Sequence, residues 1–198
     1  MTVLDITSAT KVSGALRELV EHTSRSVVFV RGASGSGSGV IWDQPGIVLT
    51  NHHVVPSQTA ELTLHGGRRV RARVIRRAPA LDLAALAVDE PLPDKALAGD
   101  SDALRVGDLV VAVGNPMGER NAPSVGILAS TPAEVLRLAI TLRPGNSGGA
   151  LVNARGEVVG IPHMVTGSGL ALAVSTASVR GFLNGATGEF DNEGLRWV

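Results

Sequence analysis

The chain has 198 residues, with 18 basic and 18 acidic side chains and no cysteine. This length is enough to bury a core without covalent staples. The missing cysteines exclude disulfides but fit both a reducing compartment and many exported bacterial proteins. The balanced charge provides no overall field to attract nucleic acid or an anionic membrane surface, so we expect neither as a partner.

The N-terminal segment predicts a short helix. Apolar residues recur at helical spacing over residues 11–22, and Ser8 or Thr10 could cap its start. The segment has no apolar run typical of a signal peptide, and no window of the chain approaches the apolar length of a membrane span. As written, the chain is expected to be cytoplasmic and to contain no membrane segment; it would be exported or periplasmic if a leader has been removed.

Two sets of short strands follow, separated by turns rich in Gly, Pro, Asn and Asp. The first six are predicted at 26–31, 37–42, 46–50, 60–65, 69–76 and 83–88. A proline-containing crossing at 91–99 leads to six more, predicted at 109–114, 124–129, 135–140, 150–153, 157–163 and 170–174. A short C-terminal helix ends at Gly185. We expect one domain over 1–198, with a leading segment, two strand-rich halves and a C-terminal helix and tail at 1–22, 23–95, 96–175 and 176–198.

One basic cluster lies on the strand predicted at 69–76. Its members are Arg68, Arg69, Arg71, Arg73, Arg76 and Arg77. They alternate with small apolar residues, which is typical of an edge strand with a charged solvent face. A basic binding patch is the alternative interpretation.

A glycine-rich stretch at 143–149 surrounds Ser147, downstream of the adjacent histidines His52 and His53. A serine hydroxyl is a poor nucleophile at neutral pH. It needs an imidazole to accept its proton and a buried carboxylate to hold that imidazole. Asp82 has the most apolar neighbours of any acid in the chain. The pattern therefore predicts acyl transfer, most simply peptide hydrolysis, by Ser147 with one of the histidines and Asp82.

The glycines beside Ser147 also predict a site for the oxyanion. Backbone N–H groups of a tight loop stabilise that charge, and glycine allows the close approach. The expected oxyanion hole is Gly145, Asn146 and Ser147, with Gly145 and Ser147 as donors and Asn146 supplying loop geometry.

Each assignment has an alternative in which the residue is only structural. Ser147 could be a turn serine, His53 a core histidine, and Asp82 a capping or surface aspartate. Five histidines raise the question of a metal site, but neither His-x-x-x-His nor His-Glu-x-x-His occurs in the chain. No metal and no cofactor are expected.

Five motifs occur in one order along the chain: Thr50–Val55, Asp82–Ala84, Asp102–Asp108, Gly114–Gly118 and Gly145–Val152. Together they resemble the trypsin-like peptidases of the HtrA (DegP-like) family. The resemblance assigns the base to His53 and not to His52. It implies an all-β fold of two six-stranded antiparallel β-barrels with short N- and C-terminal helices, and a site in the cleft between the barrels.

The same resemblance implies a substrate pocket beside Ser147. Its floor and walls are predicted at Thr141, Leu142, Val165 and Ala171. The substrate-binding strand is predicted at His163, Met164 and Val165, with His163 near Asp82. A small apolar pocket without an acid predicts cleavage after small aliphatic residues such as Val, Ala or Ile. This preference should be broad, because apolar pockets discriminate weakly between methylenes.

Some features depart from the family pattern. The loop between the first two strands is short, and the chain has no PDZ module, so regulation through either is not expected. Aromatic residues are few, which leaves the oligomer open between monomer and trimer. Two functions are considered. One is a serine endopeptidase that acts on unfolded or exposed protein segments, with protein quality control as its expected role. The other is a catalytically latent binding or chaperone-like module of the same fold.

Overall fold

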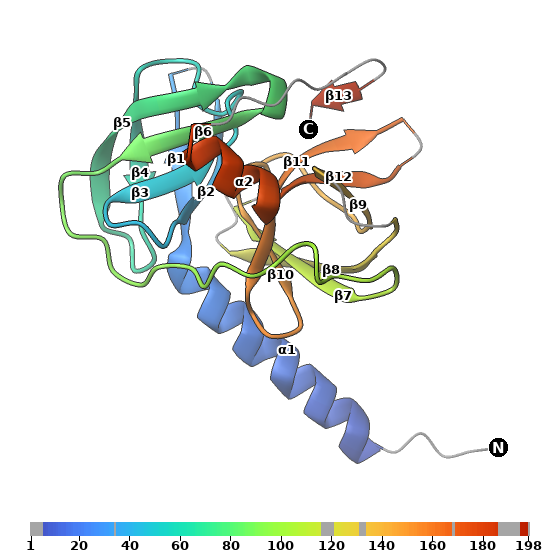
Figure 1. The fold of residues 1–198 in the computed structure, drawn as a ribbon. Helices are drawn as coiled ribbons and strands as arrows, with labels where there is room; N and C mark the ends of the chain where they lie inside the picture. The colour runs from blue at the N-terminus through green and yellow to red at the C-terminus, as the bar shows by residue number, and fades with distance from the viewer. Residues whose placement is uncertain are drawn as a thin grey trace.

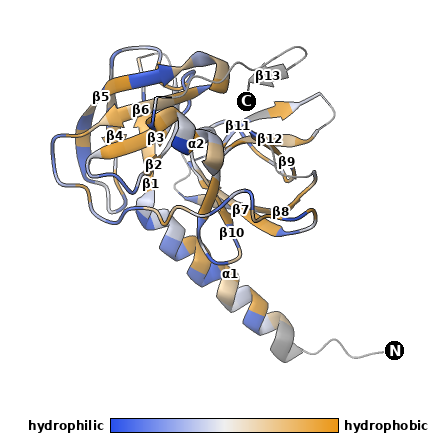
Figure 2. Cartoon of the chain, viewed as in Figure 1, coloured by the Kyte–Doolittle hydropathy of each residue, from blue (hydrophilic) through white to orange (hydrophobic). Residues whose placement is uncertain are grey.

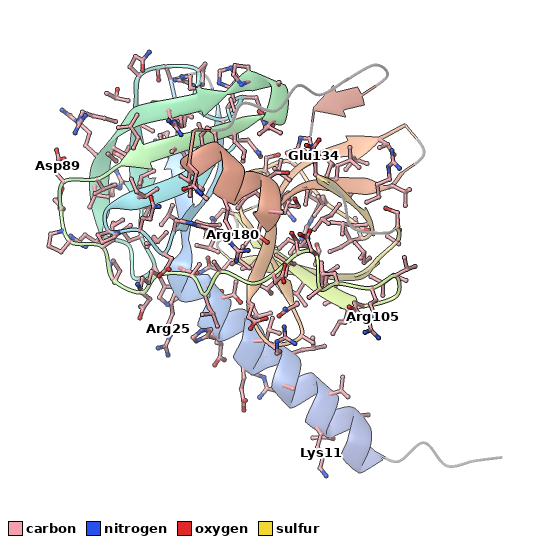
Figure 3. The ribbon with its side chains drawn as sticks, viewed as in Figure 1. Lys11, Arg25, Asp89, Arg105, Glu134 and Arg180 are labelled. Atoms are coloured by element: carbon pink, nitrogen blue, oxygen red, sulfur yellow. The ribbon has the colours of Figure 1, made fainter. Side chains whose placement is uncertain are left out.

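The computed structural model describes residues 6–33, 35–115, 121–130, 134–167, 169–185 and 195–197. Two strand-rich halves lie side by side, and α2 (Thr176–Leu183) lies across them at their seam (Figure 1). The long helix α1 (Ile6–Ser26) projects away from both halves. Figure 3 shows Lys11 towards the free end of this helix and Arg25 at the end next to the barrels.

The first half is a closed antiparallel barrel with strand order β1-β2-β3-β6-β5-β4. Its strands are β1 (Val27–Arg31), β2 (Ser36–Ile41), β3 (Ile47–Thr50), β4 (Thr59–Thr63), β5 (Arg69–Ala78) and β6 (Leu83–Ala87). Period-two burial explains the strands: on β5, Val70 and Ala72 are buried while Arg69, Arg71 and Arg73 face solvent.

The second half is also a six-stranded ring, in the order β10-β7-β8-β9-β12-β11 and closed by pairing between β10 and β11. Its strands are β7 (Leu109–Gly114), β8 (Ala122–Leu128), β9 (Val135–Ala139), β10 (Ala150–Asn153), β11 (Val158–Thr166) and β12 (Ala171–Ser175). A further strand, β13 (Leu195–Trp197), pairs with β11 outside this ring. The predicted fold class, two six-stranded antiparallel barrels with terminal helices, is confirmed.

A shared apolar core fixes the two barrels against each other. Val27 and Leu49 from the first barrel pack in one buried cluster with Val111 and Val152 from the second and with Phe182 of α2. Each barrel also has its own buried cluster. Figure 2 shows the hydrophobic colouring concentrated on the strands, whereas α1 alternates between hydrophilic and hydrophobic residues. This shared core holds segments of the two barrels in fixed positions relative to each other.

Three details differ from the sequence predictions. The N-terminal helix extends beyond 11–22 at both ends, so Ser8 and Thr10 lie inside it and do not cap it. The added C-terminal turn is largely buried, and its Thr23 and Ser26 hydroxyls donate to the helix carbonyls of Leu19 and Thr23. Neither β13 nor the short 3-10 helix η1 (Pro79–Leu81) was predicted.

The arginine-rich strand β5 is not an edge strand, because it pairs with β4 on one side and β6 on the other. A β-bulge falls between Val74 and Arg76 and shifts the alternation by one residue. As a result Arg77 is half-buried, whereas Arg71 on the regular part of the strand is exposed.

Candidate active site

His53 and Asp82 meet through two contacts. His53 lies in the turn after β3, and its Nδ1 is 2.7 Å from Asp82 Oδ2. Its backbone N–H donates to the other carboxylate oxygen at 3.0 Å. The Asp82 side chain is 2% exposed and that of His53 is 26% exposed. The carboxylate is therefore shielded from water, while the ring that it orients still reaches solvent.

Local backbone geometry holds Asp82 in this position. It ends η1 with φ 51° and ψ 41°, a left-handed conformation that is uncommon outside glycine. Its N–H donates to the Pro79 carbonyl at 3.0 Å, and its own carbonyl accepts from the His52 N–H at 3.1 Å. The Asn51 side-chain amide donates to the same carbonyl at 2.9 Å. The turn bearing the histidines is thus fastened to Asp82 by backbone as well as side chain.

The two adjacent histidines face different partners. His52 Nδ1 lies 3.1 Å from Arg77 Nη1, and Arg77 also donates to the carbonyls of Val55 and Ser57, both at 2.6 Å. Burial, with the neighbouring Arg77 charge, lowers the pKa of His52. The carboxylate therefore faces His53, and the guanidinium faces His52 and supports the segment that follows the pair.

His163 lies behind the carboxylate, with its Nδ1 3.8 Å from Asp82 Oδ2 and its side chain 5% exposed. It sits at a bulge in β11, between Pro162 and Met164, which turns it out of the regular alternation. Burial lowers the pKa of His163 to about 4, against an opposing effect of Asp82. His163 is therefore neutral at pH 7 and does not compete with His53 as a charged partner of Asp82.

The loop bearing Ser147 is held by backbone contacts from the first barrel. The Ser38 N–H donates to the Ser147 carbonyl at 2.9 Å, and the Ser38 hydroxyl donates to the Gly145 carbonyl at 2.7 Å. The Asn146 N–H donates to the Arg143 carbonyl at 3.0 Å. The Asn146 amide is therefore bonded within the turn, which fixes the shape of the loop before Ser147.

Glycines in and around this loop allow it to touch neighbouring backbone. Gly148 has φ 81°, and a Cβ there would overlap the Ser38 carbonyl oxygen and lie 3.2 Å from the Asn51 nitrogen. A Cβ on Gly114 would lie 3.0 Å from the Asn146 Cα. A side chain at Gly148 is excluded by this overlap and by the positive φ, and one at Gly114 would require the Ser147 loop to shift. The Ser147 loop is thus packed directly against the segment that leads into His53.

Ser38 was missed in the sequence, where it reads as one serine of a glycine-serine run. It is fully buried on β2, and its hydroxyl also accepts from the Asn115 backbone N–H at 2.7 Å. Thr50 Oγ1 donates to its carbonyl at 2.7 Å. One side chain and its backbone thus join β2, β3, the end of β7 and the Ser147 loop. The only sequence signal is that the serine lies between two glycines, where close backbone approach is possible.

The residues predicted to form the substrate pocket do not all lie in one kind of environment. Thr141 is exposed, and Leu142 and Val165 are half-buried against the second-barrel core. Ala171 is fully buried in that core. The Met164 side chain lies outside the described residues. The pocket therefore stays a prediction. Within the part of the chain that the structure describes, no cluster of three His, Cys, Asp or Glu side chains could hold a metal ion.

Comparison with known proteins places this arrangement in a family. Residues 37–161 match the family described as trypsin-like peptidase domain, which is more than half of the chain. The chain belongs to the trypsin-like peptidase family. The match includes the segments that carry His53, Asp82 and Ser147, the last two of them separated by the crossing between the barrels.

Curated relatives of this trypsin-like peptidase domain are of the DegP and HtrA type, as the sequence motifs predicted. This chain is 38% identical over 167 residues to the putative serine protease HhoA of Synechocystis sp., and the match covers 74% of this chain and 42% of that protein. Identity is 39% over 137 residues to the periplasmic serine endoprotease DegP of Escherichia coli, with coverage of 63% and 29%. It is 35% over 153 residues to the probable periplasmic serine endoprotease DegP-like of Chlamydia trachomatis, with coverage of 71% and 31%. The chain spans less than half the length of each of these relatives.

Proposed function

We propose that the chain is a serine endopeptidase in which Ser147 is the nucleophile, His53 the general base and Asp82 the carboxylate that orients the base. The observation that carries this proposal is the double contact between Asp82 and His53, at 2.7 and 3.0 Å, on a turn whose leading segment packs against the Ser147 loop. An aspartate with only a structural role would need neither a carboxylate shielded from water nor a partly exposed histidine ring as its partner.

The proposed mechanism uses each atom of this arrangement. In the tautomer that donates Nδ1–H to Asp82, His53 Nε2 is the acceptor and takes the proton from Ser147 Oγ as Oγ attacks the substrate carbonyl carbon. The imidazolium then gives that proton to the leaving amine. A water molecule repeats the sequence on the acyl-enzyme, which releases the acid and restores Ser147. Asp82 stays ionised and stabilises the imidazolium throughout.

The oxyanion would be stabilised by the N–H groups of Gly145 and Ser147. Support comes from the loop geometry, because Ser38 holds the Gly145 carbonyl and Arg143 accepts from Asn146. Both bonds fix the orientation of the peptide group between Gly145 and Asn146. Each oxyanion donor is worth about a hundred- to a thousandfold in kcat.

For the substrate, we propose exposed or unfolded protein segments cleaved after small aliphatic residues. The predicted pocket residues Thr141, Leu142, Val165 and Ala171 include no acid to hold a Lys or Arg side chain. A periplasmic or otherwise exported location belongs to the same proposal, because two of the relatives are periplasmic endoproteases. A role in protein quality control is also part of this proposal and rests on the resemblance to the HtrA (DegP-like) family. The described part of the chain contains no helix long and apolar enough to cross a membrane.

The test compares wild type with Ser147→Ala, using Ser36→Ala as the control because Ser36 is an exposed serine on β2. Casein is the substrate, new termini are mapped by mass spectrometry, and a fluorophosphonate reports the activated hydroxyl. We expect cleavage and labelling of wild type and Ser36→Ala alone, with loss of about 10⁴- to 10⁶-fold in Ser147→Ala. Cleavage by Ser147→Ala at the wild-type rate would show that another residue is the nucleophile.

The alternative, a catalytically latent binding module, is favoured by one observation. β13 pairs with β11 along the edge of β11 that also contacts the Ser147 loop, through the bond from the Gly148 N–H to the Pro162 carbonyl. Failure of the wild-type protein to react with the fluorophosphonate, while remaining folded, would favour this alternative.

A further inference from the structure

One edge of β11 carries three contacts in succession. β10 pairs with it at residues 158–160. The Gly148 N–H then donates to the Pro162 carbonyl at 2.9 Å, which ties the Ser147 loop to the strand. β13 follows at residues 164–166, while β12 lies along the opposite edge. β13 is therefore the next structure on this edge beyond the proposed nucleophile.

The direction of β13 matters as much as its place. It is antiparallel to β11, with Thr166 opposite Leu195, Val165 opposite Arg196 and Met164 opposite Trp197. Its chain thus runs towards Pro162 and the Ser147 loop. Met164 is two positions from Pro162, a distance of about 7 Å along a strand. An extended peptide in this place and direction would present its next carbonyl groups to Ser147.

We propose that β13 is a built-in competitor, in which the C-terminal strand of the chain occupies the edge of β11 where an extended peptide substrate has to pair. This inference rests on the proposed peptidase function. Peptides bind to a sheet edge through main-chain hydrogen bonds, which β13 satisfies with its own backbone. Substrate therefore pairs with β11 only after β13 has left it.

The geometry of β13 makes this competition reversible. It is three residues long and, within the described ranges of the chain, pairs with β11 alone, outside the closed ring. Short edge strands with a single partner open at low free-energy cost. A tethered strand acts at an effective concentration on the order of millimolar, so a weakly pairing strand raises the apparent KM by about two- to tenfold.

The experiment removes the pairing without shortening the protein. Proline lacks the N–H donor, and successive N–H groups of a strand point to opposite edges. Of the two variants Leu195→Pro and Arg196→Pro, one therefore removes a donor directed at β11. Arg196→Ala keeps the backbone donor and is the matched control. Two substrates are used: a peptide of eight or more residues with a central Val, and a single-residue valine ester that needs no strand pairing.

We expect at least one proline variant to lower the KM for the long peptide about two- to tenfold, with kcat unchanged and ester hydrolysis equal to wild type. Arg196→Ala should behave as wild type. If both proline variants keep the wild-type KM for the long peptide, β13 is not a competitor and the proposal is wrong.

Two further measurements separate this outcome from failure of the peptidase proposal. Fluorophosphonate labelling of Ser147 tests the proposed function directly; if no variant is labelled, that function fails and this inference fails with it. Amide hydrogen exchange at Val165 tests the pairing without any activity. The Thr166 N–H donates to the Leu170 carbonyl at 2.8 Å on the other edge, and successive N–H groups alternate, so the Val165 N–H is the one directed at β13. Exchange should be faster in a proline variant than in Arg196→Ala. Equal exchange in all chains would show that β13 does not pair with β11 in solution and would overturn the inference even in an active enzyme.

Discussion

Replacement of Ser38 by alanine should damage both stability and activity, although Ser38 is not one of the residues proposed to react. Its hydroxyl donates to the Gly145 carbonyl at 2.7 Å and accepts from the Asn115 backbone N–H at 2.7 Å. Ser38→Ala removes this hydroxyl, so the Gly145 carbonyl and the Asn115 N–H both lose their partner without a substitute. Ser38 and Asn115 are buried, so the Asn115 N–H in particular loses its partner away from water.

The size of the effect follows from the groups left unpaired. A buried polar group without a partner costs about 1–3 kcal/mol. Gly145 is only half-buried, so the share of its carbonyl is placed at the low end. We expect a loss of about 2–4 kcal/mol in the free energy of unfolding. For a domain of this size that corresponds to a fall in Tm of about 5–15 °C.

Activity should fall further than stability requires, because the lost bond orients the Gly145 carbonyl beside the proposed oxyanion donors. At a temperature where the variant is folded, the rate of fluorophosphonate labelling should drop about 10- to 100-fold. Ser36→Ala, at the exposed start of the same strand, is the matched control and should stay within about 0.5 kcal/mol of wild type. A Ser38→Ala protein with the Tm and labelling rate of Ser36→Ala would refute the reasoning.

Three further predictions concern the same site. Gly148→Ala should prevent labelling of Ser147 and lower Tm strongly, because its Cβ would overlap the Ser38 carbonyl oxygen; Gly167→Ala, with nothing within 4 Å of its Cβ, should do neither. His163→Asn should flatten the acid limb of stability. Burial holds the pKa of His163 in the folded protein at about 4, below the ordinary 6.5. The stability contributed by burying the neutral ring is therefore complete above pH 6.5 and is lost as the pH falls towards 4. Urea unfolding should show wild type losing about 3 kcal/mol more than the variant between pH 7 and 4, and parallel pH profiles would contradict this. Arg77→Met should lower the free energy of unfolding by about 1–3 kcal/mol, because it removes the two hydrogen bonds at 2.6 Å to carbonyls of the segment after the histidines. In thermal melts, Arg71→Met on the exposed face should leave Tm nearly unchanged.

The strands were predictable because their alternating burial is written directly in the sequence. Residues 109–114 and 150–153 were placed at their true bounds, since each is an apolar run closed by turn residues. The family and the proximity of His53 to Asp82 were also predictable, because glycine-rich and histidine-containing motifs need particular residue types at particular spacing. The roles of those residues remain proposals.

The features that the sequence did not reveal depend on pairing between distant segments. Arg77 and Arg71 are the same residue type on one strand, and only the bulge between Val74 and Arg76 turns one of them inward. β13 has three residues, too few for a pattern to repeat, and is a strand only because β11 offers a free edge. Ser38 matters through contacts to positions 107 and 77 residues away in the chain.

The projecting helix α1 has a practical consequence. Its 21 residues extend for about 30 Å, yet the packed side chains Leu16, Leu19 and Val20 all lie in its second half. The first turns rest on local backbone bonds, and a free helix of that length is marginal in water. Lys11 and its exposed neighbours stand clear of the barrels (Figure 3). That end of the molecule therefore suits a fluorophore or surface tether, because a probe attached there leaves the proposed triad and the interface between the barrels untouched.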